Sequence, residues 1–314
     1  MLNRRHIRVK VMQSIYAMHQ NGSDNLQKEE KFLFYSIENI LDLYLIMLSS
    51  IIEIRDKEQL YLDKSAKKHL ATPQERNPNT KFVRNALVDM LSESRSLNIA
   101  LEHRKINNWK QNDDYILIML SEIRNSDLYN EYMSTTKTTF EQDRQFVIDM
   151  FMELIAPNEK LYEYLEDNKL TWVDDIPLVN TQIVKQLRQI KPDSPHSFAV
   201  PELYKDDEDR DFAKELFRKT VLNETELAKE YIDKTPNWDT ERIAEIDTII
   251  LKMAICEFLK FPSIPVKVTI NEYLEIAKEY STPKSSIFIN GILDNLVKEF
   301  QAAKKLNKTG RGLM

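Results

Sequence analysis

The chain has 314 residues, of which 42% are hydrophobic and 30% charged, so it can bury the cores of two domains or of one domain with a large insertion, and disorder over its whole length is excluded. Its 4 glycines form neither a G-x-G-x-x-G turn nor a G-x-x-x-x-G-K loop, which disfavours the familiar nucleotide-driven enzymes. The formal net charge of −6 argues against indiscriminate nucleic-acid binding by the chain as a whole.

The amino-acid usage predicts an all-α protein of the cytoplasm. Few glycines beside many Leu, Ile, Glu, Lys, Gln and Met residues favour helices over hairpins. The single cysteine, Cys256, allows no internal disulfide and no cysteine-based zinc site, which fits a reducing compartment. No secretion signal follows Met1 and no apolar stretch approaches the length of a membrane span, so we expect neither.

The first predicted helix covers residues 4–19, with apolar side chains at helical spacing from Val11 to Met18. The same face becomes cationic at Arg8 and Arg4, so we expect the first turns to overhang the core and face solvent. Residues 1–23 contain no acidic side chain and four basic ones: Arg4, Arg5, Arg8 and Lys10.

The following region contains several helices of moderate amphipathicity. The clearest are predicted over residues 26–62, 81–105 and 113–133. Prolines mark breaks at 72–79 and at 191–196, because proline removes a backbone donor and restricts the residue before it.

Residues 140–190 resemble a segment that lies 66 positions further along the chain. Asp143-Arg-Gln-Phe146 aligns with Asp209-Arg-Asp-Phe212, and Trp172 falls opposite Trp238. Two interpretations remain open: a duplicated helical hairpin, or a coincidence between two amphipathic helix pairs of similar composition. The predicted buried stripes are Phe146, Met150 and Leu154 in the first copy and Phe212 and Leu216 in the second.

The first helix of the C-terminal region is predicted to start at Asp239, a good N-cap. Asp247 and Glu257 interrupt its apolar stripe. An unpaired buried charge is costly, so each carboxylate must either extend to the edge of the core or accept a hydrogen bond from a specific donor. The stripe itself consists of Ile243, Ile246, Ile250, Met253 and Ala254.

Two further helices follow. Thr269 and Glu272 have the spacing of a capping box for a helix that ends at about Tyr280. Thr282 is predicted to cap the last helix, with Pro283 at its first position.

A glycine lies inside that last helix, where it costs about 1 kcal/mol relative to alanine. We expect Gly291 to permit close helix packing, and Asn271 and Asn290 to join helices by hydrogen bonds. These three residues are interpreted as architectural.

Motifs at both ends of the chain resemble one known family. Arg4-Arg-His-Ile-Arg8 leads to Gln13-Ser-Ile-Tyr16 near the start. The C-terminal motifs are Glu241-Arg-Ile-Ala-Glu-Ile-Asp247 running on to Glu257, Pro265-Val-Lys-Val-Thr-Ile-Asn-Glu272, Ala277-Lys-Glu-Tyr280 and Phe288-Ile-Asn-Gly-Ile-Leu-Asp294. Together these motifs resemble the NusB transcription antitermination family over about residues 3–20 and 205–300.

The resemblance implies a fold of two small helical bundles with a large helical insertion. The Arg-rich helix would occupy residues 1–23, the insertion 24–204, the family core 205–301 and a basic flexible tail 302–314. The family is non-catalytic. It binds the boxA element of nascent RNA, pairs with the small-subunit ribosomal protein NusE, and makes elongating RNA polymerase resist termination on ribosomal RNA operons.

Two basic patches are candidates for RNA contact. Guanidinium and ammonium groups on an exposed helix end can bind phosphate, and a helix N-terminus can hold an anion. The first patch is Arg4, Arg5, Arg8 and Lys10, and the second is Lys284, Ser285, Ser286 and Phe288. Simple capping at Ser285 and a core role for Phe288 remain alternatives. Asp247 and Glu257 are candidates for a NusE-like partner surface or for internal pairing.

Catalysis, a metal site and a cofactor are not expected. The histidines form no metal-binding pair, and Asp193-Ser-Pro-His196 lies in a proline-broken linker that cannot hold a triad rigidly. The alternative function is a protein-interaction scaffold whose RNA affinity is lost or incidental. Salt dependence separates the two, because binding to phosphates weakens as salt rises.

Overall fold

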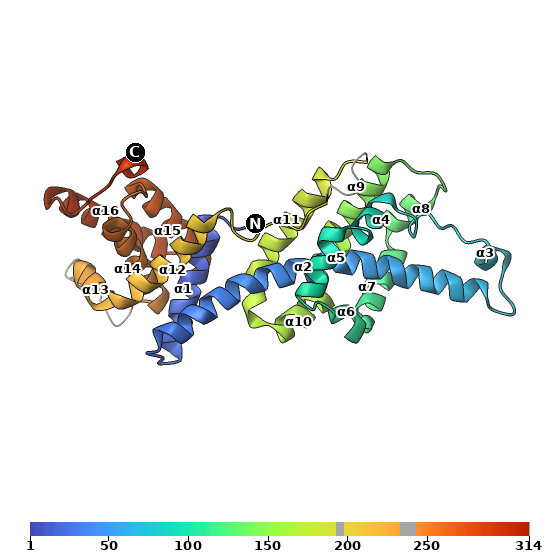
Figure 1. Ribbon diagram of the computed structural model, residues 1–314, viewed down its shortest axis with the longest axis horizontal. Coiled ribbons are helices and arrows are strands. Elements are labelled where there is room, and N and C mark those ends of the chain that lie inside the picture. Colours follow the sequence, from blue (N-terminus) through green and yellow to red (C-terminus); the bar gives the residue numbers. More distant parts are fainter. Residues whose placement is uncertain (193–197, 233–242, 314) are drawn as a thin grey trace. The chain divides into compact units, whose positions relative to one another are not determined.

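The computed structural model describes residues 1–192, 198–232 and 243–313. Within these ranges the regular elements are helices and no strand occurs, so the all-α prediction is confirmed (Figure 1). None of the helices in this described part is long and apolar enough to cross a membrane.

The chain divides into two compact units. Unit 1 combines residues 1–37 with 203–314, and unit 2 consists of residues 38–202. Unit 2 is therefore an insertion between the two parts of unit 1. The sequence-based boundaries lie elsewhere, after residues 23 and 204, because α2 begins within unit 1 and continues as one helix into unit 2.

Unit 1 is built around α14, which packs against α1, α12, α13, α15 and α16. Ile250, Met253 and Ala254 of its predicted apolar stripe are fully buried, whereas Ile246 is half-buried and Ile243 lies before the helix begins. The helices of unit 1 are α1 (Arg4–Gln20), the start of α2 (Leu26–Ala66), α12 (Asp207–Leu222), α13 (Glu224–Ile232), α14 (Glu245–Lys260), α15 (Val266–Tyr280), α16 (Ser285–Ala302) and the 3-10 helix η4 (Gly310–Leu313).

The first helix confirms its predicted bounds to within one residue. Asn3 fixes its start, because the Asn3 side chain accepts a hydrogen bond from the His6 backbone N–H at 3.0 Å. The His6 ring in turn accepts one from the Asn3 backbone N–H at 3.3 Å. This reciprocal capping box satisfies two N–H groups that the helix leaves free.

Two predicted helix starts in unit 1 are wrong. α15 begins three residues before Thr269, so Thr269 and Glu272 lie inside the helix and their side chains bind other partners. α16 begins at Ser285, and Thr282 and Pro283 form the turn before it. The predicted N-cap Asp239 lies outside the described residues.

Three further expectations for unit 1 are corrected. Gly291 is exposed, and a Cβ placed there would meet nothing within 4 Å, so the glycine serves no close helix packing. Asn271 is exposed, and Asn290 donates only to Asp294 on its own helix.

The predicted flexible tail instead packs onto unit 1. The Thr309 backbone N–H donates to the Pro262 carbonyl at 3.0 Å. Gly312 is buried, and a Cβ at this position would lie 1.9 Å from the Pro262 oxygen. Only glycine fits this approach, so the turn after α14 holds the tail.

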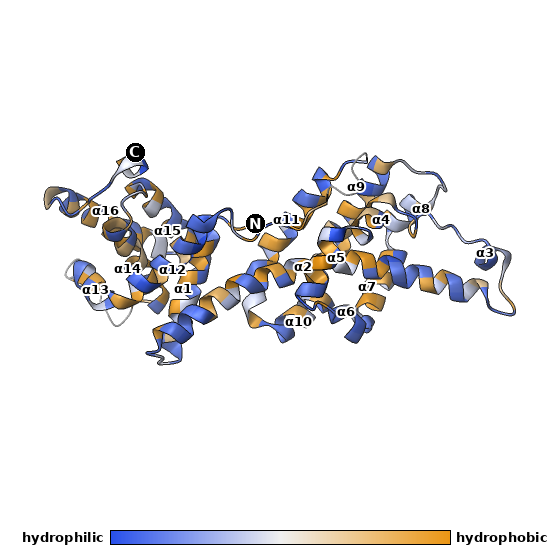
Figure 2. Cartoon of the chain, viewed as in Figure 1, coloured by the Kyte–Doolittle hydropathy of each residue, from blue (hydrophilic) through white to orange (hydrophobic). Residues whose placement is uncertain are grey.

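Unit 2 is a second helical unit in which hydrophobic residues recur along α2 between polar ones (Figure 2). Besides most of α2, its elements are α3 (Pro73–Arg76), α4 (Ala86–Ser92), α5 (Arg95–His103), α6 (Asn108–Gln111), α7 (Asp113–Asn125), α8 (Asp127–Met133), α9 (Phe140–Met150), the π-helix η1 (Phe151–Ile155), α10 (Glu159–Asn168), the 3-10 helix η2 (Leu170–Asp175) and α11 (Ile176–Gln189).

The helix predicted over 26–62 is confirmed and runs four residues further. The prediction of one continuous helix over 81–105 and another over 113–133 is wrong, because each range contains more than one helix. Ser94 breaks the first because its hydroxyl accepts from the Leu97 N–H at 3.2 Å. Ser126 breaks the second in the same way, accepting from the Tyr129 N–H at 3.1 Å.

The π turn also shifts the first predicted stripe. Phe146 and Met150 are buried as predicted, but Ile155 is buried in place of the half-buried Leu154. The extra residue of a π turn rotates the following side chains around the helix. In the second copy Phe212 and Leu216 are buried as predicted. The duplication itself stays a prediction, and its partner residue Trp238 lies outside the described residues.

Each unit contains a buried residue with distinctive chemistry. Cys256 in α14 is free and fully buried, and burial raises the pKa of its thiol to about 11. Trp109 and Trp172 are buried in unit 2, where their ring N–H groups donate to the carbonyls of Ile46 and Asn39.

Candidate functional site

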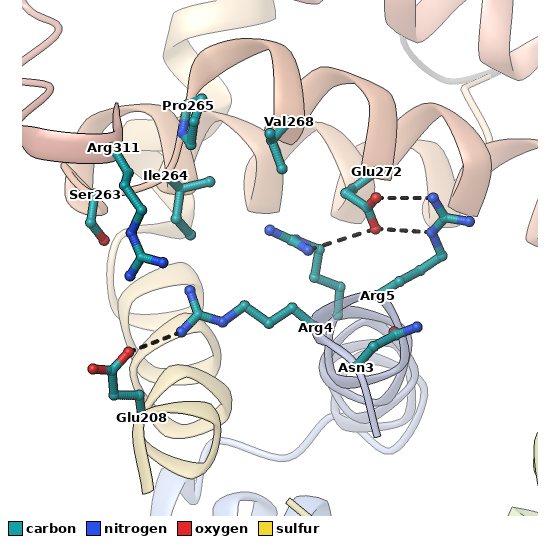
Figure 3. Close-up of a pocket in the computed structure, with 11 residues that line it drawn as sticks. Asn3, Arg4, Arg5, Glu208, Ser263, Ile264, Pro265, Val268, Glu272 and Arg311 are labelled. Carbon is teal, nitrogen blue, oxygen red and sulfur yellow. Dashed lines mark hydrogen bonds and ion pairs between the residues drawn. The ribbon is translucent and has the colours of Figure 1, made fainter. Parts of the chain in front are cut away.

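A groove of about 580 Å³ lies on unit 1 beside the first turns of α1 (Figure 3). Four arginines point into it or line its floor, and Glu208 and Glu272 stand among them. Its apolar part comes from Ile264, Pro265 and Val268, of which Val268 is 43% exposed. We call this surface the arginine groove and define it by Arg4, Arg5, Arg8, Arg311, Ile264, Pro265 and Val268.

Arg4 and Arg5 are partly exposed in the groove, with 36% and 40% of their side chains accessible. Arg4 Nε donates to Asp209 at 3.0 Å. Arg5 donates to both carboxylate oxygens of Glu272 at 2.9 Å, and this hydrogen bonding raises the pKa of Arg5. Asp209 is buried, with 8% of its side chain accessible, whereas the Arg5–Glu272 pair is partly exposed on both sides. A partly exposed ion pair contributes little to stability, so another anion can compete for Arg5 and can approach the accessible side of Arg4.

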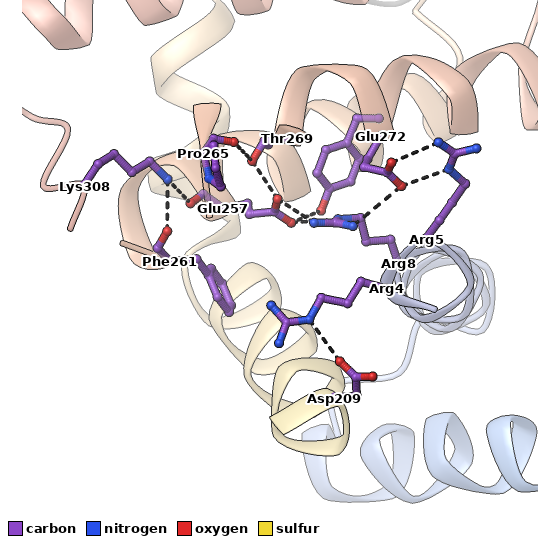
Figure 4. A network of polar contacts seen from close by, with 11 residues as sticks. Arg4, Arg5, Arg8, Asp209, Glu257, Phe261, Pro265, Thr269, Glu272 and Lys308 are labelled. Atoms are coloured by element: carbon purple, nitrogen blue, oxygen red, sulfur yellow. Dashed lines mark hydrogen bonds and ion pairs between the residues drawn. The ribbon is translucent and has the colours of Figure 1, made fainter. Parts of the chain in front are cut away.

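Arg8 has a different environment (Figure 4). Only 2% of its side chain is exposed, and it donates to both Glu257 oxygens at 2.8 and 2.9 Å. Burial acts to lower the pKa of Arg8, but the charge and hydrogen bonds of Glu257 outweigh it and raise the pKa overall. Thr269 and Tyr273 also donate to Glu257, at 2.6 and 3.3 Å. The expectation that the first turns face solvent is therefore wrong at Arg8.

Lys10 is also buried, with 3% of its surface accessible. The first predicted patch thus separates into two partly exposed arginines, Arg4 and Arg5, and two buried basic residues, Arg8 and Lys10. The reason is packing: α1 lies against α12, α14 and α15 along most of its length, so its first turns are part of the core.

Arg311 enters the groove from the folded-back tail. It is exposed and has no ion-pair partner among the described residues. Lys308 anchors the tail close by, because its ammonium group donates to the carbonyls of Glu257 and Phe261 at 3.2 and 3.0 Å. Burial lowers the pKa of Lys308. Sequence analysis missed Arg311, although the flanking Gly310 and Gly312 set it apart in a chain with few glycines.

The second predicted patch surrounds the start of α16. Ser285 is buried, and its hydroxyl donates to Asp247 at 2.7 Å, while Ser281 donates to the other Asp247 oxygen at 2.6 Å. Lys284 is exposed, and Ser286 and Phe288 are half-buried. Lys284 and Phe288 line a cavity of about 100 Å³. A carboxylate of the protein itself therefore lies at the positive end of this helix.

Asp247 and Glu257 both pair with side chains inside unit 1, which was one of the two alternatives predicted for them. Asp247 binds two serine hydroxyls, and Glu257 binds Arg8, Thr269 and Tyr273. Neither is an exposed surface residue, since at most 5% of each is accessible. Their charge holds unit 1 together.

The arginine groove combines the contacts that single-stranded nucleic acid needs. Guanidinium groups donate to phosphate and can stack on a base, and an apolar wall beside them can cover a base. No group of three or more metal-ligating side chains occurs in the described part of the chain. Asp193 and His196, the residues of the linker motif, lie outside the described ranges.

Comparisons with known proteins agree on one family. The model of the NusB family matches residues 181–298. "Transcription antitermination protein NusB" of Salinibacter ruber is 47% identical over 120 residues, which are 38% of this chain and 74% of that protein. The proteins of the same name from Chloroherpeton thalassium and Dictyoglomus turgidum are 37% and 48% identical, over 41% and 26% of this chain and 62% and 58% of their own lengths. No solved structure gives a significant match.

Proposed function

Because the chain belongs to the NusB family, as a long form with unit 2 inserted, we propose that it is an RNA-binding transcription antitermination factor. It binds boxA-like single-stranded RNA together with a NusE-like small-subunit ribosomal protein. The assembly joins the elongating RNA polymerase on ribosomal RNA operons in the cytoplasm. The protein performs no catalysis and needs no cofactor in this role.

The arginine groove is the observation that supports this proposal. The partly exposed Arg4 and Arg5 and the exposed Arg311 line the groove together with the apolar side chain of Val268. RNA phosphates displace Glu272 from Arg5 and bind the accessible side of Arg4, whose Nε stays on the buried Asp209, and Arg311 provides a third guanidinium group. Arg8 contributes by holding the groove floor through Glu257, not by contacting RNA.

We expect RNA and the ribosomal protein to bind unit 1 cooperatively. RNA and the partner protein each cover part of unit 1, and together they create a larger surface than either offers alone. By thermodynamic linkage, each ligand then raises the affinity of the other by the same factor.

The test is binding of a short boxA-like single-stranded RNA to the full chain, followed by fluorescence anisotropy across a salt series. RNA is added alone and with a NusE-like ribosomal protein. For Arg4→Ala/Arg5→Ala we expect affinity to fall about tenfold or more at low salt. The slope of log affinity against log salt should become shallower by about 1.4, since each phosphate on single-stranded RNA contributes about 0.7.

A matched control removes two exposed arginines of unit 2, in Arg84→Ala/Arg95→Ala, and should leave affinity and slope unchanged. An equal loss in both double variants would attribute binding to overall charge. Absence of RNA binding under all conditions would overturn the proposal and favour the helical protein-interaction scaffold.

A further inference from the structure

A second groove, of about 540 Å³, lies within unit 2 between the π-helix η1 and α11. Its apolar lining includes Met152, Ala156 and Val184, and 47% of Met152 is exposed. Asn180, Lys185 and Arg188 of α11 provide its polar groups. This groove takes no part in the proposed RNA contact.

One wall of the groove is the π turn itself. The Ala156 backbone N–H donates to the Phe151 carbonyl at 2.8 Å, five residues back, and both residues line the groove. A π turn widens the helix and replaces α-helical hydrogen bonds with less favourable ones, and such turns occur frequently at functional sites. The turn brings Met152 and Ala156 to the groove.

Asn180 supplies an acceptor that nothing in the described part of the chain satisfies. Its Oδ1 atom is buried and has no hydrogen-bond donor among the described residues. A buried polar atom without a partner is costly. Asn180 lines the groove, so rotation of its amide would turn this oxygen toward a ligand that places an N–H group there.

The charge of the groove is opposite to that of its unit. Residues 38–202 contain 20 Lys and Arg against 27 Asp and Glu, a net charge of −7. α11 nevertheless contains no acidic residue. Lys185 and Arg188 are exposed one helical turn apart, and neither has an ion-pair partner among the described residues. These two cations favour the binding of an anionic ligand at this groove.

We propose that this groove binds an acidic amphipathic helix of a partner protein. The apolar face of that helix packs on Met152, Ala156 and Val184. Carboxylates one turn apart on its flank pair with Lys185 and Arg188, whose positions are about 4.5 Å apart along α11. A donor group on the partner helix satisfies Asn180.

A helix fits this groove better than RNA does. The net charge of unit 2 repels a polyanion, and the groove lining contains no exposed aromatic ring for base stacking. A largely apolar peptide with only two carboxylates is repelled much less by the net negative charge of unit 2.

The probe is a fluorescein-labelled helical peptide of about 16 residues with a leucine face flanked by glutamates, and a second peptide with lysines in place of the glutamates. Both are titrated into the full chain. We expect the acidic peptide to bind and to shift the Met152 methyl resonance, assigned by Met152→Leu. Lys185→Glu/Arg188→Glu should weaken it about tenfold or more and should give the lysine peptide the higher affinity.

Arg84→Glu/Arg95→Glu makes the same charge change elsewhere on unit 2 and should leave peptide binding unchanged. Asn180→Leu tests the unpaired acceptor: thermal stability should stay the same or rise, while affinity for the acidic peptide falls about threefold or more. Failure of the acidic peptide to bind overturns the proposal. So does an equal loss in the control variant, or displacement of the peptide by a short single-stranded RNA.

Discussion

The starts of α1 and α16 both bring cationic side chains to a helix N-terminus, yet they offer different surfaces. At α1 the partly exposed carboxylate of Glu272 pairs with Arg5, and both Arg5 and Arg4 remain about two-fifths exposed although the partner of Arg4, Asp209, is buried. At α16 the carboxylate of Asp247 is buried against the hydroxyls of Ser281 and Ser285. A helix start is thus open to an external anion only where the chain's own anion remains exchangeable.

The largest expected effect is on the buried pair beneath the arginine groove. Glu257→Gln leaves the buried Arg8 charge with only the more distant Glu272, at 3.8 Å, as a counter-ion, and should lower the free energy of unfolding by about 3–5 kcal/mol. Urea unfolding measures it. Arg8→Met/Glu257→Met removes both charges and should recover much of the loss. A single variant within about 1 kcal/mol of wild type would show that the pair is not the anchor.

Asp247→Ala tests the other helix start. Loss of the acceptor for two buried hydroxyls should cost about 1–3 kcal/mol. RNA affinity should stay within about twofold of wild type at a temperature where the variant is folded. A large rise in affinity that Lys284→Ala abolishes would break the comparison, because it would make the start of α16 a phosphate site that Asp247 merely covers.

Gly291→Ala should stabilise the protein by about 0.4–1 kcal/mol. Gly291 is exposed inside α16, and a Cβ there meets no atom within 4 Å. A higher thermal midpoint with unchanged RNA binding would separate the stability of α16 from function. A lower midpoint would mean that the glycine serves a contact outside the described residues.

The smallest effect concerns the far end of α1, where His19 pairs with Glu224 at 2.8 Å and Glu245 at 3.1 Å. The hydrogen bond that the His19 ring donates to Glu224 raises the pKa of His19 above 6.5. The stabilisation is therefore complete below the unfolded pKa and is lost as pH rises through the folded pKa. We expect His19→Gln to be less stable than wild type by under about 1 kcal/mol at pH 6, with no difference at pH 9. A difference that grows with pH would contradict this assignment.

Local patterns predicted much of this fold. The α1 periodicity gave its bounds, and the long apolar stripe of α2 gave a helix of nearly the observed length. The breaks at Ser94 and Ser126 were missed because serine is tolerated inside helices, and only the fold decides whether its hydroxyl caps one. The π turn at Phe151 has no comparable sequence pattern.

The site was harder to predict because its pairs are far apart in sequence. Arg8 continues the apolar face of α1, and Glu257 interrupts the apolar face of α14. The sequence alone predicts that Arg8 faces solvent and allows either a partner surface or internal pairing for Glu257, because it cannot join positions 249 residues apart. Arg311 depended on the fold even more, since Gly312 packing on Pro262 brings it to the groove.

The buried thiol of Cys256 makes the two units separately observable. A thiol with a pKa of about 11 and no solvent contact resists alkylation, so its labelling rate reports the opening of unit 1 alone. The fluorescence of Trp109 and Trp172 reports unit 2, once Trp238→Phe removes the third indole. The chain thus contains one natural probe for each unit. Together they can show whether an RNA bound to one unit, or a helix bound to the other, slows the unfolding of both.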